Sequence, residues 1–112
     1  MIVNGTDLSM MRGDSDTLTV SCMEGEAPRP FIPGDTVDLT IKYSTADERP
    51  VLRLTATEFA GGNAVFAFAP EATKGLLSGD YVYDVQLTAA DGRVCTIIEP
   101  SGFVLRGDVT SE

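Results

Sequence analysis

The chain has 112 residues, of which 43% are hydrophobic, and a formal net charge of −9 from 8 Lys and Arg against 17 Asp and Glu. This length suits one domain with its own core, and the hydrophobic share excludes wholesale disorder. So acidic a chain repels nucleic-acid phosphates and anionic membranes, and we expect neither as a partner. No apolar run approaches the ~20 residues that cross a bilayer. Residues 1–4 lack the cationic and apolar regions of a signal peptide. We therefore expect a single domain over residues 1–112 that no signal peptide directs to secretion.

The chemistry-bearing residues argue against an enzyme. The chain has two cysteines, Cys22 and Cys95, and no histidine. A reducing compartment would keep the cysteines as free thiols, although whether they ever pair stays open. Without histidine there is no Ser-His-Asp triad, Cys-His pair or imidazole metal site. Neighbouring carboxylates lie beside turn residues, where exposure is commoner than catalysis: Asp14 with Asp16, Asp35 with Asp38, and Asp47 with Glu48. We expect no catalytic residues, no cofactor and no metal.

The first third of the chain predicts two strands and a connection. Residues 2–11 contain an Asn-Gly turn signal and are predicted to hold one short strand. Residues 12–16 read as a turn, and residues 17–22 alternate between Thr or Ser and Leu18, Val20 and Cys22, which predicts a strand with one buried face. Residues 24–33 hold three prolines, which lack the ladder donor, so this stretch is a connection.

Three further strands and one helical turn follow. Residues 37–43, 51–56 and 64–68 are strands; in the first, Val37, Leu39, Ile41 and Tyr43 are expected to point inward. Residues 70–77 have room for at most one helical turn, with Pro70 near its start.

The C-terminal part has the clearest alternation of the chain. Gly79 leads into a strand whose odd positions are large and apolar and whose even positions are mostly polar. An Asp91-Gly92 hairpin signal precedes a partner strand over residues 93–98. Residues 100–102 are expected to break that strand, residues 103–105 to form a closing strand, and residues 106–112 to fray.

These elements predict an all-β fold of about seven to eight short strands, an immunoglobulin-like antiparallel β-sandwich, with a small barrel as the alternative. The pattern Leu-x-Gly-x-Tyr-x-Tyr at residues 77–83 has the look of the corner in such sandwiches, where a Tyr hydroxyl bonds back to the preceding turn. The expected corner and core residues are Gly79, Tyr81, Tyr83, Val85 and Leu87.

Two adhesion-type Arg-Gly-Asp triplets, at residues 12–14 and 106–108, are interpreted as a turn and a chain end. The sequon at residues 4–6 needs a secretory route that the sequence does not show.

Four segments stand out: Pro33-Gly34-Asp35-Thr36-Val37, Leu77-Ser78-Gly79-Asp80-Tyr81-Val82-Tyr83-Asp84-Val85-Gln86-Leu87, Asp91-Gly92-Arg93-Val94-Cys95-Thr96, and Gly102-Phe103-Val104-Leu105 with Asp108-Val109-Thr110. Through them residues 31–110 resemble small bacteriophage and prophage virion proteins and the N-terminal domains of phage baseplate upper proteins. The resemblance implies an immunoglobulin-like docking domain of a tail, baseplate or fibre, in a virion or in the bacterial cytoplasm. No catalytic residue carries over from that family.

The leading hypothesis is a non-enzymatic assembly module that docks to other virion or tail proteins, or to further copies of itself, through sheet edges or loops. Strand addition is expected at the edges formed by Leu8 and Met10 and by Phe103 and Leu105. The alternative is a carbohydrate- or host-surface-binding module, which would need exposed aromatic residues such as Phe31, Phe59 or Tyr43.

Overall fold

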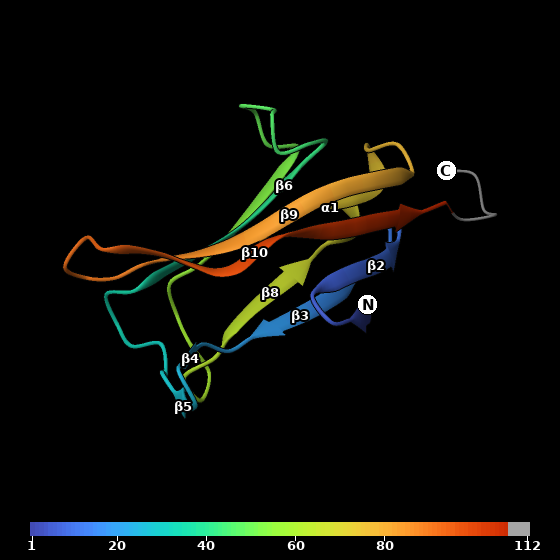
Figure 1. Cartoon of the computed structure of the whole chain (residues 1–112). Helices are drawn as coiled ribbons and strands as arrows, with labels where there is room; N and C mark the ends of the chain where they lie inside the picture. The colour runs from blue at the N-terminus through green and yellow to red at the C-terminus, as the bar shows by residue number, and fades with distance from the viewer. Residues whose placement is uncertain (108–112) are drawn as a thin grey trace.

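A computed structural model describes residues 1–107, which form ten strands and one short helix. The strands make two packed sheets of very different size, a six-stranded sheet and a two-stranded one, together with a small two-stranded ribbon (Figure 1). The large sheet has the order β1 (Ile2–Asn4), β2 (Asp7–Met11), β10 (Val94–Arg106), β9 (Gly79–Thr88), β6 (Thr36–Lys42) and β7 (Leu52–Ala56). The small sheet pairs β3 (Asp16–Val20) with β8 (Ala64–Phe68), and the ribbon pairs β4 (Met23–Glu24) with β5 (Ala27–Pro28).

The strand order is that of an immunoglobulin-like sandwich. In such folds the C, F and G strands lie together in one sheet, B and E lie in the other, and the variable type extends the first sheet with C′. Here β6, β9 and β10 take the places of C, F and G, β7 that of C′, and β3 and β8 those of B and E. The large sheet is antiparallel except where β2 runs parallel to β10. The expected all-β sandwich is confirmed, and the sheets do not close into a barrel.

The core lies between the two sheets, on the faces that alternation predicted. Three aromatic rings connect the layers: Phe68 of the small sheet lies 6.1 Å from Phe103 of the large one, and Phe103 meets Tyr83 edge-on at 6.4 Å. The remaining buried apolar side chains of the strands come from both sheets: Leu8, Met10, Val20, Val37, Leu39, Ile41, Ala56, Ala64, Phe66, Tyr81, Val85, Leu87 and Leu105.

The tyrosine strand forms the expected corner. Tyr81, Tyr83, Val85 and Leu87 are all buried, while Gly79 at the start of β9 is exposed and has a φ of +149°, a backbone conformation that favours glycine. The Tyr81 hydroxyl donates a hydrogen bond of 2.5 Å to the carbonyl oxygen of Leu77, in the preceding turn. The bond back to the turn, predicted from the spacing alone, is therefore present.

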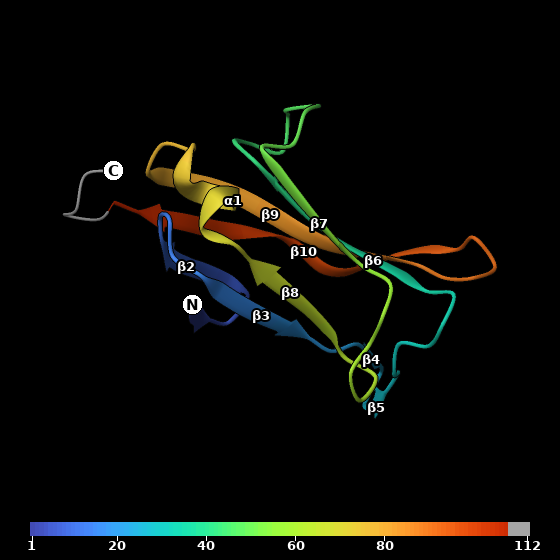
Figure 2. The ribbon, with the colours of Figure 1, turned by 180° about the vertical axis from the view of Figure 1, so that it is seen from behind.

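One helical turn, α1 (Pro70–Lys74), joins β8 to β9 at the end of the sandwich opposite the β9–β10 turn (Figure 2). Its buried Thr73 accepts a hydrogen bond of 2.8 Å from the backbone N–H of Gly13, so the helix also holds the turn between β2 and β3. No helix among residues 1–107 has the length and apolarity to span a bilayer.

The prediction of one strand in residues 2–11 is wrong, because this segment folds into a hairpin. Gly5, with φ of +62°, and Thr6 make a two-residue turn between β1 and β2, and Ile2 pairs with Ser9. Asn-Gly is the strongest short hairpin signal. Here it joins two strands rather than preceding one.

The predicted break at residues 100–102 is also wrong. β10 runs unbroken from Val94 to Arg106, with register shifts between Thr96 and Ile98 and between Ile98 and Ser101. Proline is tolerated in strands at bulges and on free edges. Pro100 lies at such a bulge, before β2 begins to pair with β10 at Phe103.

Tyr43 does not point inward as expected. β6 ends at Lys42, and the Tyr43 side chain is 56% exposed. Its ring stacks on that of Tyr81 at 5.2 Å.

Replacing Tyr81 with Ala should lower the free energy of unfolding by about 3–5 kcal/mol, because a buried aromatic ring is lost. Tyr81→Phe keeps the ring and removes only the hydrogen bond to Leu77, so its cost should be about 1 kcal/mol. Urea denaturation of both variants measures these costs, with the exposed Gln86→Ala as the control of little effect. Equal costs for Tyr81→Ala and Gln86→Ala would contradict the assignment of the two faces of β9.

Candidate functional site

The two edges predicted for docking are not edges. β2 is flanked by β1 and β10, and β10 is flanked by β9 and β2, so Leu8 pairs with Phe103 and Met10 with Leu105 inside the sheet. All four side chains are at most 3% exposed. Alternation shows which face of a strand is buried but not which strands neighbour it, and here the β1 hairpin and the parallel β2–β10 pair cover the predicted edges.

The free edges of the large sheet, among the described residues, belong to other strands. β1 and β7 are its outermost members. A third free edge lies along the first half of β10, because β2 pairs with β10 only from Phe103 to Arg106. At the start of that gap Asp7 accepts a hydrogen bond of 2.9 Å from the Gly102 N–H, so the exposed segment of β10 runs from Val94 to about Ser101.

An apolar cleft opens beside this exposed segment of β10. Its volume is about 360 Å³, and its lining comes mainly from residues 21–24, just beyond β3, and from β9 and β10. The β9–β10 hairpin continues past the end of the small sheet here (Figure 1). We call it the hairpin cleft. The apolar and thiol side chains that line it are Cys22, Met23, Leu87, Ala89, Cys95, Ile97 and Ile98.

Both cysteines line the hairpin cleft as free thiols. Cys22, expected to be buried, is half-buried just beyond β3, and burial raises the pKa of its thiol. Cys95 is exposed on β10.

The charged residues at the cleft are largely neutralised. Arg29 donates a hydrogen bond of 2.6 Å to the buried carboxylate of Asp35, and Arg93 pairs with Asp91 at 3.1 Å. Glu24, which also lines the cleft, has no ion pair or side-chain hydrogen bond within residues 1–107.

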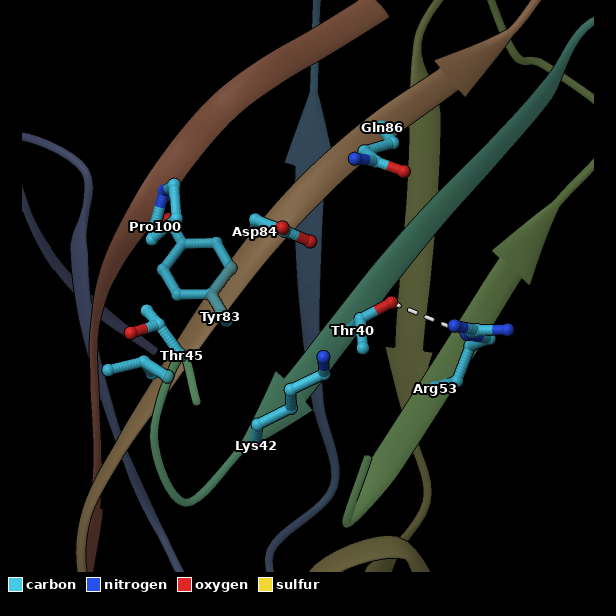
Figure 3. A pocket seen from close by; sticks show the side chains of 9 residues that line it. Thr40, Lys42, Thr45, Arg53, Tyr83, Asp84, Gln86 and Pro100 are labelled. Atoms are coloured by element: carbon cyan, nitrogen blue, oxygen red, sulfur yellow. Dashed lines mark hydrogen bonds between the residues drawn. The ribbon is translucent and has the colours of Figure 1, made fainter. Parts of the chain in front are cut away.

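A second hollow lies on the opposite, solvent-facing side of the large sheet (Figure 3). It has a volume of about 220 Å³, and we call it the sheet-face groove. Its floor comes from β6, β7 and β9, and Thr45 and Pro100 lie at its rim. The lining residues are Thr40, Lys42, Thr45, Arg53, Val82, Tyr83, Asp84, Gln86 and Pro100.

The carboxylate pairs noted in the sequence do not act together. Asp35 accepts hydrogen bonds from Arg29 and from the Ile32 N–H, whereas Asp38 accepts one of 2.5 Å from the Thr55 hydroxyl. Asp16 forms an ion pair with the Met1 ammonium. Within residues 1–107 no group of three or more His, Cys, Asp or Glu side chains could hold a metal ion.

The first Arg-Gly-Asp triplet forms the turn between β2 and β3, as interpreted. In the second, Arg106 ends β10 and Asp108 lies outside the described residues, as do the rest of the tail and the Asp-Val-Thr segment of the resemblance.

The aromatic residues considered for sugar stacking are mostly engaged elsewhere. Phe31 is 3% exposed and packs against Phe59 at 5.2 Å. Tyr43 is exposed but stacks on Tyr81, and none of the three lines the sheet-face groove. Any sugar bound there would depend on hydrogen bonds rather than on a stacked ring.

No protein-family model, no curated protein and no solved structure matches the chain.

The Asp35–Arg29 pair predicts a loss of stability in acid. The hydrogen bond from Arg29 holds the pKa of the Asp35 carboxyl below its ordinary value, against the opposing effect of burial. A carboxyl with a lowered folded pKa contributes stability that is complete above its unfolded pKa of about 3.9. That contribution is lost as the pH falls through the folded pKa. Asp35→Asn should lower the free energy of unfolding by about 1.5–3 kcal/mol at pH 7. It should also make the free energy of unfolding fall less steeply as the pH drops below 4.

Urea denaturation at several pH values measures this effect. Asp91→Asn is the matched control, because Asp91 also pairs with an arginine and accepts a hydrogen bond from a backbone N–H but is exposed. Its replacement should therefore change the free energy of unfolding little at any pH. A wild-type acid decline that Asp35→Asn leaves unaltered would contradict the role of Asp35.

Proposed function

We propose that this protein is a non-enzymatic docking module that binds an extended segment of another protein at the hairpin cleft. The observation that carries the proposal is the position of the apolar cleft directly beside the unpaired part of β10. Backbone groups of an exposed strand edge bind an extended chain, and an adjacent apolar hollow selects its side chains.

The exposed apolar side chains at this end of the sandwich support the proposal. Met23, which lines the cleft, is 56% exposed, and the half-buried Ile97 and Ile98 continue the apolar surface. A segment lying along β10 would remove these groups from water, which is favourable at about 25 cal/mol per Å².

Charge defines the chemistry of the partner segment. The chain carries a net charge of −9, and the two arginines at the cleft are paired with Asp35 and Asp91, while Glu24 has no ion pair within residues 1–107. A second copy of this chain would meet like charge. The favoured occupant is therefore a segment that alternates apolar residues with Lys or Arg.

The resemblance carried by residues 31–110 supports a setting for this docking. In a phage or prophage particle the segment would belong to another tail, baseplate or fibre protein. Light scattering of the purified chain mixed with the proteins encoded by the neighbouring genes measures this directly: a complex of defined mass with a tail, baseplate or fibre protein is expected, whereas a chain that stays monomeric with each of them would contradict the setting.

A capped peptide of alternating Val and Lys should bind the hairpin cleft, because it offers both strand pairing and apolar side chains. In a ¹⁵N–¹H NMR titration of the full chain, the amide shifts should concentrate in residues 94–98 and around Cys22. The same peptide with N-methyl groups on alternate amides cannot pair as a strand and should bind at least about tenfold more weakly. A Val-Glu peptide should also bind more weakly, because the protein is acidic.

One surface variant and a matched control locate the contact. Met23→Asn should weaken peptide binding, and Leu77→Asn, at a side chain 77% exposed that does not line the cleft, should not. Shifts concentrated on β1 or β7 would place docking at another edge and overturn the assignment to the cleft, as would the absence of binding.

A further inference from the structure

The sheet-face groove is a second candidate binding surface, on the face of the large sheet that points away from the core. Arg53, Thr40 and Asp84 lie in one row across β7, β6 and β9, since Thr40 is in register with both of the others. In the next row Lys42 lies opposite Val82. Figure 3 shows the polar side chains rising from these three strands on the same side of the sheet.

The polar groups of the groove are not satisfied by one another. Within the described part of the chain, Lys42, Asp84 and Gln86 make no side-chain hydrogen bond or ion pair, and Arg53 has only a long contact of 3.4 Å with the Thr40 hydroxyl. Neighbours on adjacent strands are close enough to interact. The neighbouring polar row of β6 and β7 shows that such side chains can pair across strands, because Thr55 donates a hydrogen bond to Asp38 there.

The groups in the groove define the ligand. The ammonium of Lys42 and the guanidinium of Arg53 suit a carboxylate, and the Asp84 carboxylate accepts hydrogen bonds from hydroxyl groups. Val82 and Pro100 supply apolar surface for C–H groups. The volume of about 220 Å³ lies below the ~300–1,000 Å³ of sites for drug-sized ligands, so it suits a single ring.

We propose that the sheet-face groove binds a carboxylated sugar unit of the uronic-acid class. Lys42 and Arg53 hold the carboxylate, and Asp84 and Gln86 bind ring hydroxyls. The net charge of −9 repels anions at long range, so recognition depends on these local contacts. A neutral sugar lacks the carboxylate, and a simple carboxylate lacks the hydroxyls.

Three probes separate these contributions in an NMR titration of the full chain: glucuronate, glucose and acetate. Glucuronate should shift the amides of β6 and β9 around the groove with a Kd on the order of 1 mM, as for a small ligand on an open surface. Glucose and acetate should each bind at least about tenfold more weakly, because each lacks one set of contacts.

Variants test the assigned residues. Lys42→Met and Asp84→Asn should each weaken glucuronate binding about tenfold, since each removes a charge-assisted hydrogen bond. Arg49→Met and Glu58→Gln make the same charge changes at exposed positions outside the groove and should leave the Kd unchanged. Preserved amide spectra in the absence of ligand show that each variant is folded.

Equal affinity for acetate and glucuronate would mean a simple anion site and would overturn the proposal. So would shifts outside the groove, or binding that Lys42→Met and Asp84→Asn do not affect. These outcomes are independent of docking at the hairpin cleft, which lies on the other face of the sheet and is measured with a peptide.

Discussion

The unequal size of the two sheets is the constraint on which the rest of the structure depends. β3 and β8 have five residues each and span about 17 Å at ~3.3 Å per residue. β9 has ten residues and β10 has thirteen, so each has at least twice as many residues as the strands of the small sheet that covers them. The inner face of the hairpin therefore continues beyond the small sheet. Its apolar side chains are only half covered there, and this leaves the hairpin cleft.

The other end of β9 is held firmly by its two tyrosines. The hydroxyl of Tyr81 is bonded to the carbonyl of Leu77, and that of Tyr83 donates to the carbonyl of Thr6 in the β1–β2 turn. Burial raises the pKa of Tyr83 to about 12, so this hydroxyl stays protonated and able to donate throughout the neutral range. β9 thus has one end fixed by part-buried hydrogen bonds and one end projecting, and the proposed docking takes place at the projecting end.

Much of the fold could be predicted from the sequence because alternation reports burial directly. It identified β3, β6, β8 and β9, and the Gly-x-Tyr spacing located the corner. Alternation could not identify which strands lie next to one another, since Leu8 and Met10 would alternate in the same way on an edge strand or on an interior one. Nor could it locate either hollow: Cys22 and Ile98 meet across the cleft from distant parts of the chain, and Arg53 and Asp84 share a row only through β6. Such juxtapositions depend on strand order, which local patterns do not encode.

The bulges in β10 connect the two surfaces. In the ladder with β9, Thr96 is in register with Gln86 and Ile98 with Val85, so Ile97 is the extra residue of the bulged strand. Two successive isoleucines therefore line the hairpin cleft, where a regular strand would turn one of them to the opposite face. The next register shift, before Ser101, contains Pro100, which lies at the rim of the sheet-face groove. The irregular segment that the sequence presents as a break thus shapes a hollow on each face of the sheet. If β10 continued straight in the register of Thr96 with Gln86, Phe103 would lie opposite Gly79 instead of Tyr81, and each hollow would lose one wall.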